Sequence, residues 1–433
     1  MKSSRLYEVC PAALFSDDAK ASGRVLGVDR WLLRTLLQGI GSPDIGAALW
    51  DGENIVPGVT APLRMTIRNR TTLLRLMANP LLYFGDDYSA GNIEIQGGLV
   101  EFLETVYRAM ERPGEVRRRY KSFSNLYRQG MNTLTGSREN IHHHYDIGND
   151  FYRLWLDDEM LYTCAYFTNP EMPLEAAQDA KMDLICRKLQ LKGGERVVEA
   201  GCGWGGLARY MAKRYGARVR AFNISGEQLS YARQRAKDEG ISGIEYIEDD
   251  YRNITGECDA FVSVGMLEHV GTNNYRKLGE VIDRTLAKNG IGLIHSIGQD
   301  VAEPMSEWAE RRIFPGSYLP TVREMMEIFE PRGLSVLDLE NLRPHYARTL
   351  EHWLARFEAN TAQVEQMFDE NFVRAWRLYL SSSIASFSTG SLQLFQVIFS
   401  RRGNNQLPWT RSHLLEPARK DSSRVPLLEE RSL

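Results

Sequence analysis

The residues best suited to chemistry stand in a glycine-rich turn, VVEAGCGWGG, at positions 197–206. Glycine permits tight turns and lets the backbone come close to a ligand, so Gly201, Gly203 and Gly205 predict a nucleotide-type cofactor beside this turn. The same segment satisfies the dinucleotide pattern G-x-G-x-x-G through Gly201, Gly203 and Gly206. The glycines alone therefore leave a nicotinamide cofactor open beside other nucleotide ligands, and a turn that only joins strand to helix is the third alternative.

Residues around the turn decide between these cofactors. Glu199 stands two positions before the first glycine and suits a cationic or amino-bearing ligand. About 20 residues further on, where a dinucleotide site places an acidic residue for the ribose, the chain has Asn223 and Ser225. Trp204 inside the turn leaves little room for a pyrophosphate. These features favour the sulfonium cofactor S-adenosylmethionine (SAM) over NAD.

Acid–base candidates follow at the ends of later apolar segments. Glu268 and His269 end the fourth expected strand, and His295 ends the fifth. The carboxyl ends of parallel strands meet at the edge of a sheet where ligands bind, so these groups are expected to lie together. The stretch DDY at 249–251 ends the third strand and is a candidate for adenine and ribose contacts. A purely structural role is the alternative for each of these residues.

Three consecutive histidines, His142 to His144, raise the question of a metal site. Consecutive residues of a helix point in different directions around its axis, whereas a metal needs converging ligands from several elements. No metal site is therefore expected. The five cysteines are scattered without a C-x-x-C pair, which predicts reduced thiols in a cytoplasmic protein.

These residues need a scaffold that brings several strand ends to one edge. From position 196 short apolar segments alternate with amphipathic helical ones, which indicates an α/β fold with a doubly wound, mostly parallel sheet. The expected strands cover residues 196–202, 218–225, 244–251, 258–266 and 290–298. Two further strands, at 335–342 and 392–402, are expected at the edges of this sheet.

The chain of 433 residues divides into four expected parts. Residues 1–111 form a smaller α+β domain, 112–140 a basic linker, 141–403 the catalytic domain around the glycine turn, and 404–433 a polar tail. Helices are expected in the first part at 31–39 and 98–110. The net charge of −3 gives no reason to expect nucleic acid as a partner. No apolar run approaches the ~20 residues of a membrane span.

A series of motifs in order along the chain carries a family resemblance: HYDIGNDFYRLWLD, YTCAYF, AGCGWGGLA, FVSVGMLEHVG, HSIG, IFPGSYLPT, HYARTLEHW and QLFQVIFSRRG. From about Ile141 to Gly403 the chain resembles the cyclopropane-fatty-acyl-phospholipid synthases, which are SAM-dependent methyltransferases. The resemblance implies a class I SAM-methyltransferase fold with a seven-stranded sheet. Residues 1–111 also resemble the accessory domain of members that act on phospholipids. A lipid-binding role of that domain, and unsaturated membrane phospholipid as substrate, are therefore expected.

The resemblance also implies the site residues and the assembly. A bicarbonate ion is expected to act as the base, held by the positions that match Cys164, Glu268, His295, Ile297 and Tyr346. Cys164 and Ile297 are expected to act through main-chain groups. SAM is expected to contact Tyr162, Thr163, Glu199, Gly201, Gly203, Gly205, Asn223, Ser225, Gln228, Asp250, Tyr251 and Arg252. A homodimer is the expected oligomeric state.

Methyl transfer to a cis double bond would give a carbocation that water must not reach. Aromatic faces stabilise such a charge by ~0.5–2 kcal/mol each. The candidates, some of which are expected to be core residues only, are Tyr162, Tyr166, Phe167, Tyr318 and Tyr346. A base then removes a proton from the new methyl group and the ring closes. Loss of a different proton would give a methyl-branched or methylene product, and a catalytically inactive lipid-binding protein is a further alternative.

Two positions depart from the family pattern. Thr163 stands where serine is usual, which keeps the hydroxyl group. Ser383 stands where some members carry a cysteine that has been proposed as a nucleophile. The mechanism above needs no covalent nucleophile, so activity is expected to survive both changes.

The double bond of such a substrate lies inside a bilayer, so the protein is expected to dock on the inner face of the membrane. A basic stretch with interleaved aromatic residues is the candidate surface. Its cations are Arg117, Arg118, Arg119, Lys121 and Arg128. A solvated linker helix is the alternative for this stretch.

Overall fold

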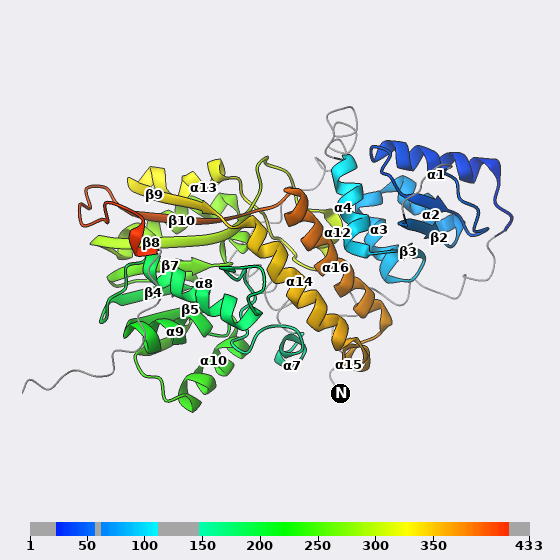
Figure 1. Ribbon diagram of the computed structural model, residues 1–433. Coiled ribbons are helices and arrows are strands. Elements are labelled where there is room, and N and C mark those ends of the chain that lie inside the picture. Colours follow the sequence, from blue (N-terminus) through cyan, green and yellow to red (C-terminus); the bar gives the residue numbers. More distant parts are fainter. Residues whose placement is uncertain (1–22, 57–61, 111–146, 415–433) are drawn as a thin grey trace, which may run out of the picture.

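The computed structural model describes residues 23–56, 62–110 and 147–414 (Figure 1). We call residues 23–110 the small domain and residues 147–414 the large domain. The cations of the basic stretch and the three consecutive histidines lie outside the described residues, as does most of the expected polar tail. No helix in the described ranges is long and apolar enough to cross a membrane.

The small domain combines four helices with a three-stranded sheet among its described residues. The helices are α1 (Gly27–Gly39), α2 (Arg70–Ala78), α3 (Pro80–Ser89) and α4 (Leu99–Met110). The strands are β1 (Gly46–Ala48), β2 (Arg64–Ile67) and β3 (Ile93–Gln96), with β2 in the middle. Strand β2 pairs in parallel with β1 and antiparallel with β3. The helices expected near 31–39 and 98–110 are therefore present as α1 and α4.

The large domain is built on a seven-stranded sheet with the order β6-β5-β4-β7-β8-β10-β9. Its strands are β4 (Arg196–Ala200), β5 (Arg218–Asn223), β6 (Ile244–Glu248), β7 (Cys258–Val264), β8 (Leu286–Gly298), β9 (Leu334–Asn341) and β10 (Gln393–Arg401). Strands β4 to β8 pair in parallel, and β10 runs antiparallel to both of its neighbours. The mostly parallel sheet of the class I methyltransferase fold is confirmed.

The prediction of two edge strands at the end of the chain was wrong for one of them. Strand β10 is inserted between β8 and β9, so only β9 lies at an edge. The physical reason is burial. Eight of the nine residues of β10 are buried, which requires a neighbour on each side, whereas β9 is mostly half-buried or exposed.

Helices cover both faces of the large sheet. On one face α8 (Leu174–Lys188), α9 (Gly206–Tyr215) and α10 (Gly226–Asp238) pack against β4 and β5. On the other face α11 (Tyr275–Thr285) and α13 (Val322–Phe329) pack against β7 and β10. The short helices α7 (Asn149–Arg153) and η5 (Leu267–His269) flank the carboxyl edge of the sheet.

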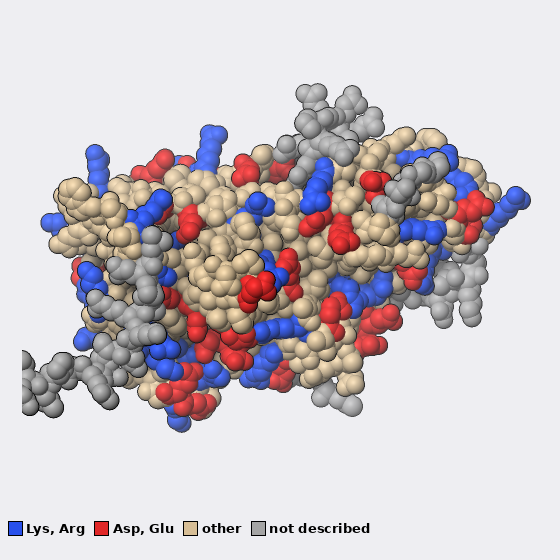
Figure 2. All heavy atoms as spheres, viewed as in Figure 1, with Lys and Arg blue, Asp and Glu red and all other residues tan. Residues whose placement is uncertain are grey.

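The two domains share one hydrophobic core. It contains side chains of both domains, among them Leu33 and Phe102 from the small one and Trp353 and Trp376 from the large one. The large domain contributes α12 (Glu307–Arg312), α14 (Arg343–Ala359), α15 (Thr361–Met367) and α16 (Glu370–Thr389) to this region. Helix α16 lies against α3 and α4, and α12 lies against α3 (Figure 1). Figure 2 shows that positive and negative side chains are interspersed on the visible face.

Candidate active site

A small cavity of about 120 Å³ lies beside the glycine turn at the carboxyl ends of β4 and β5. The backbone follows the glycine pattern, because Gly201, Gly203 and Gly205 all have positive φ angles, of 83°, 52° and 77°. Of the expected cofactor contacts, those that line this cavity are Tyr162, Thr163, Glu199, Gly201, Gly203, Asn223 and Gln228. Gly205 lies just behind it, where a Cβ atom would come within 2.8 Å of the Tyr246 hydroxyl. The turn thus supplies both the wall and the close packing of a cofactor site.

An acidic and a basic side chain face this cavity from two elements. Glu199 is 3% exposed, its burial raises its pKa to about 8, and its Oε2 atom has no hydrogen-bond partner among the described residues. Lys181 of α8 is 2% exposed and donates from Nζ to Thr163 Oγ1 at 2.8 Å. Burial lowers the pKa of Lys181 to about 8. The pair matches the ammonium and carboxylate of an amino-acid group such as the one in SAM. Sequence reasoning missed Lys181, which stands in a helix outside any motif.

The loop after β5 is held by its own polar side chains. Asn223 donates from Nδ2 to the Gly203 carbonyl at 3.2 Å and to Gln228 Oε1 at 2.8 Å. Ser225 caps α10, since its Oγ atom accepts from the Gln228 backbone N–H at 3.4 Å. Ser225 therefore shapes the loop without lining the cavity.

The residues after β6 do not line the cavity either. Asp250 is buried and accepts a hydrogen bond from the Arg252 backbone N–H at 2.9 Å. Tyr251 is also buried and belongs to a core cluster. The cofactor contacts expected of Asp250, Tyr251 and Arg252 stay predictions.

A larger cavity of about 420 Å³ adjoins the cofactor cavity. The two share Tyr162, Thr163, Gly265 and His269 as lining residues. The volume falls within the ~300–1,000 Å³ of ligand sites in proteins. Four of the five expected catalytic residues line this larger cavity: Glu268, His295, Ile297 and Tyr346. The chain fold therefore brings the acid–base candidates and the cofactor turn to adjoining spaces.

Glu268 lies in η5, and only one of its two carboxylate oxygens is hydrogen-bonded within the described residues. Its Oε1 atom accepts from the Ile297 backbone N–H at 2.7 Å. Its Oε2 atom is buried and makes no hydrogen bond within the described residues. Burial raises the pKa of this carboxyl group to about 7. Glu268 can therefore hold or release a proton near neutral pH.

A chain of hydrogen bonds fixes the tautomer of His295. Lys188 can only donate, and its Nζ atom donates to Gln396 Oε1 at 2.6 Å. The amide of Gln396 must then present Nε2 to His295 Nδ1, 3.0 Å away. His295 is neutral at physiological pH because burial, Lys181 and Lys188 lower its pKa to about 3. Its proton therefore sits on Nε2, which is buried and has no other partner in the described part of the chain.

The remaining catalytic candidates differ in their surroundings. Tyr346 is buried and lies against Phe387, with ring centroids 4.6 Å apart. Cys164 is buried, does not line the larger cavity, and donates from Sγ to the Ala165 carbonyl at 3.2 Å. Burial raises the pKa of its thiol well above the usual range. Of the five expected residues, Cys164 alone lies behind the cavity wall.

Only two of the five aromatic candidates face the larger cavity, namely Tyr162 and Tyr346. Tyr166 stacks on His345 at 4.8 Å and Phe167 on His352 at 5.5 Å, while the Tyr318 hydroxyl donates to Glu324 at 2.8 Å. These three do not line the cavity and pack elsewhere. Sequence reasoning missed several aromatic lining residues, among them Phe314 and Tyr379. Phe314 stands in the motif IFPGSYLPT, which was a signal that could have found it.

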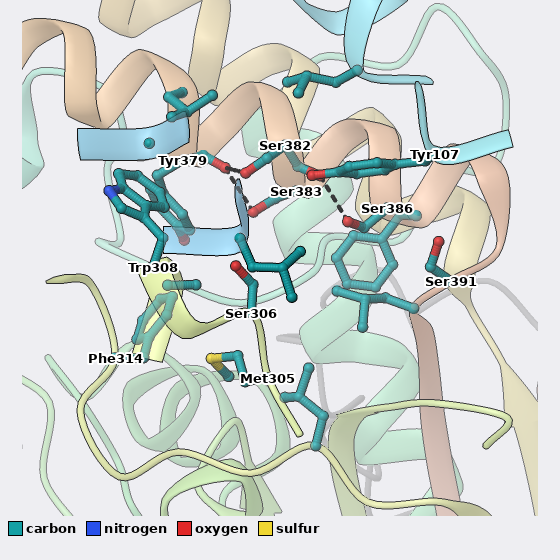
Figure 3. Close-up of a pocket in the computed structure, with 18 of the residues that line it drawn as sticks. Tyr107, Met305, Ser306, Trp308, Phe314, Tyr379, Ser382, Ser383, Ser386 and Ser391 are labelled. Carbon is teal, nitrogen blue, oxygen red and sulfur yellow. Dashed lines mark hydrogen bonds between the residues drawn. The ribbon is translucent and has the colours of Figure 1, made fainter. Parts of the chain in front are cut away.

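Serine hydroxyls line one wall of the larger cavity (Figure 3). Ser383 donates to the Tyr379 carbonyl at 2.8 Å, Ser382 donates to the same carbonyl at 3.0 Å, and Ser386 donates to the Ser382 carbonyl at 2.8 Å. Their protons are thus used within α16. Among the described residues, the Ser383 hydroxyl contacts no group that would activate it as a nucleophile.

No group of His, Cys, Asp and Glu side chains in the described residues is arranged to hold a metal ion. The three consecutive histidines lie outside those residues. The site consists of a cofactor cavity and a larger cavity beside it, and the buried Glu268 and His295 line the larger one.

Comparison with known proteins identifies the family. The family model of mycolic acid cyclopropane synthetase matches residues 132–397, which is more than half of the chain, and a domain of unknown function matches residues 32–113. A probable fatty acid methyltransferase of Pseudomonas putida is 34% identical over 378 residues, which cover 84% of this chain and 95% of that protein. The cyclopropane-fatty-acyl-phospholipid synthase of Escherichia coli K12 is 41% identical over 265 residues, covering 61% and 68%.

Solved structures give the same result. The crystal structure of mycolic acid cyclopropane synthase CmaA1 complexed with SAH and CTAB is 29% identical, with a TM-score of 0.58, and covers 60% of this chain and 97% of that chain. Coclaurine N-methyltransferase bound to N-methylheliamine and SAH, 21% identical, has a TM-score of 0.59 over 76% of this chain and 100% of that chain, and supports the fold alone. The chain therefore belongs to the mycolic acid cyclopropane synthetase family and is a SAM-dependent methyltransferase.

Proposed function

We propose that this enzyme transfers a methylene unit from SAM to the cis double bond of an unsaturated fatty acyl chain in membrane phospholipid and so forms a cyclopropane ring. The observation that carries the proposal is the junction of the two cavities at Tyr162, Thr163, Gly265 and His269. A methyl donor in the smaller cavity faces a largely apolar chamber there. The names of the relatives, which include a fatty acid methyltransferase and a cyclopropane-fatty-acyl-phospholipid synthase, support acyl lipid as the substrate class.

The protein's part in the first step is positioning and exclusion of water. The alkene must approach the methyl carbon in line, at ~3–3.5 Å, and the cavity junction sets that approach. A carbocation forms on the acyl chain. Tyr162 and Tyr346 present aromatic rings to the chamber, and cation–π attraction stabilises the charge by ~0.5–2 kcal/mol per ring.

The proton acceptor sits between Glu268 and His295 in our proposal. Both present a buried polar atom without a partner in the described structure, Glu268 Oε2 and His295 Nε2. The Nε2–H donor of His295 together with a protonated Glu268 fits a bicarbonate ion, which when bound supplies the base for the new methyl group. The Ile297 backbone N–H is already taken by Glu268, and Cys164 lies behind the wall. The donors for such an ion are therefore chiefly the two side chains.

Membrane phospholipid as the partner is also a proposal. Helix α1 exposes apolar side chains, with Trp31 60% and Val28 54% accessible. Arg24 and Arg34 are exposed beside them and form no ion pair among the described residues. Such a helix suits an anionic membrane surface, as does the basic stretch that lies outside those residues. We further propose a homodimer at the inner face of the membrane, on the strength of the family resemblance.

The test is to incubate the purified protein with methyl-labelled SAM and vesicles of cis-unsaturated phospholipid, and then to analyse the acyl chains. A gain of one methylene unit that resists mild hydrogenation means a ring. Label that never enters the lipid would overturn the proposal and favour a catalytically inactive lipid-binding protein. Omission and readdition of bicarbonate, with SAM binding measured in parallel, tests the proposed base separately.

A second product is favoured by one observation. The Pseudomonas putida relative that this chain covers almost completely is named a probable fatty acid methyltransferase. The same two cavities would then give a methyl-branched or methylene chain through loss of a different proton. In the experiment above, a labelled product that hydrogenates readily is an alkene, either a methylene chain or a methyl-branched chain that keeps a double bond.

A further inference from the structure

The larger cavity crosses from the large domain into the small domain. In the small domain its wall comes mainly from α1, α3 and α4, with Leu36 and Phe84 among the lining side chains. On α4 the lining residues Phe102, Val106 and Met110 recur every four positions, the spacing of one helix face. At a rise of ~1.5 Å per residue, this face extends the cavity by ~12 Å along α4. An extension of this length is more than a shallow depression of the protein surface.

The small-domain half of the cavity suits hydrocarbon and rejects charge. The small-domain side chains that line it are apolar except for Tyr107, whose hydroxyl is hydrogen-bonded to Ser382 and Ser386 (Figure 3). No cation of the described small domain lines it, and the facing Ser382 and Ser386 hydroxyls donate within α16, so a phosphate placed there would be buried without a counter-ion. A hydrocarbon chain would bury apolar surface there, which is favourable. The polarity therefore selects the methyl end of a lipid over its headgroup.

An ion pair, a close packing contact and hydrogen bonds join the small and large domains beside the cavity. Arg312 of α12 donates to both carboxylate oxygens of Asp86 on α3, at 3.0 and 2.9 Å, and Asp86 is 4% exposed. Next to this pair Gly85 leaves room for the Trp308 indole, since a Cβ atom would lie 2.4 Å from the ring. Arg374 of α16 donates to backbone carbonyls of the small domain at 2.7 and 3.0 Å. The small-domain wall thus has a fixed position relative to the catalytic residues.

We propose that the small domain is the chain-length gauge of the enzyme: it binds the acyl segment between the double bond and the terminal methyl group. The proposal rests on the proposed function, because it takes the double bond to react at the junction near Tyr162 and His269. From there the segment runs past Tyr107 and Val106 toward Phe102. The depth of this half then sets how many carbons beyond the double bond the enzyme accepts. The domain of unknown function that matches residues 32–113 gains a role in substrate selection.

The test uses Val106→Trp, which fills the cavity midway along α4, and Thr105→Trp as the matched control. Thr105 neighbours Val106 on the same helix but does not line the cavity. Both full-length variants are assayed with labelled SAM and two series of phospholipid vesicles. In one series the acyl segment beyond the double bond is lengthened. In the other series the segment between the ester and the double bond is lengthened. SAH binding confirms that each variant is folded.

Val106→Trp is expected to lower kcat/KM for the longest methyl-side segment at least about tenfold relative to the shortest one, a difference of ~1.4 kcal/mol. It is expected to leave the order of preference in the ester-side series unchanged, and Thr105→Trp is expected to shift neither series. Val106→Ala should move the preference toward longer methyl-side segments. An equal loss on all chains, or a shift in the ester-side series, overturns the gauge. If the unaltered protein labels no acyl chain, the proposed function itself fails, which is a distinct outcome.

Discussion

Replacing Gln396 by glutamate should invert the hydrogen-bonding sense of His295. In the native protein the Gln396 amide accepts from Lys188 and donates to His295 Nδ1, so the imidazole carries its proton on Nε2. A carboxylate in the same place can only accept. It would keep the contact with Lys188 and require a proton on Nδ1. The Nε2 atom would then face the cavity as an acceptor.

The magnitude follows from the lost donor. A buried polar group without its partner costs ~1–3 kcal/mol. If that donor acts in the rate-limiting step, kcat falls roughly 5- to 150-fold at ~1.36 kcal/mol per tenfold. The pKa of His295 is lowered to about 3 in the native protein, mainly by burial. A carboxylate beside the ring raises this pKa, so kcat of Gln396→Glu should partly recover as the pH falls, because the imidazolium donates from both nitrogens.

Steady-state kinetics across the pH range, at saturating SAM and vesicles, is the assay, and nitrogen NMR of the histidine ring reports the tautomer directly. Gln396→Met serves as the comparator, since it fills the space without dictating a tautomer and should lose less activity. Unchanged SAH binding separates this effect from misfolding. If Gln396→Glu retains full kcat while NMR shows the proton moved to Nδ1, the role assigned to the Nε2–H donor is refuted.

Three other predictions concern the cofactor, pH and the domain seam. Lys181→Met should weaken SAH binding by ~1.5–3 kcal/mol, roughly 10- to 150-fold, by loss of a charged hydrogen bond. Lys181→Arg should restore part of it, and calorimetry measures both. Burial raises the pKa of Glu268 from 4.5 to about 7, so its contribution to stability is fully present below pH ~4.5 and is lost as the pH rises through 7. Glu268→Gln should therefore flatten the pH dependence of the free energy of unfolding in urea between these pH values. An unaltered pH dependence would contradict the burial argument. Arg312→Gln should lower the free energy of unfolding by ~1–3 kcal/mol because Asp86 stays buried. Arg348→Gln removes a more accessible ion pair, with Glu351, and should cost at most ~1 kcal/mol. Equal losses in urea titrations would contradict a special role of the Arg312–Asp86 pair.

The sheet could be predicted from the sequence because its signals are local. The glycine turn, the apolar segments and the polar residues at their ends placed β4 to β8 and the carboxyl edge with Glu199, Glu268 and His295. The position of β10 could not be obtained in this way. Strand order depends on which edge offers a partner for a fully buried strand, and neighbouring residues do not encode that choice.

The residues that set the tautomer and the pKa of His295 could not be identified from the sequence, for a similar reason. Gln396 lies 101 positions from His295 in the sequence and reaches it only through strand pairing. Lys181 and Lys188 stand in helix α8, most of whose residues are buried, although lysines are normally solvated. The continuation of the cavity into the small domain depends on how two domains pack, which no motif records. The motifs identified the catalytic candidates, whereas tertiary packing determined the surroundings of His295 and the extent of the cavity.

The internal position of β10 has a consequence for biosynthesis. The histidine strand and its partner are separated by about a hundred residues of chain, and β10 comes from the end of the large domain. While a ribosome is still translating that end, the edges of β8 and β9 that will pair with β10 present backbone N–H and C=O groups that no other described strand covers. The sheet therefore cannot be completed until the chain through Arg401 has left the exit tunnel.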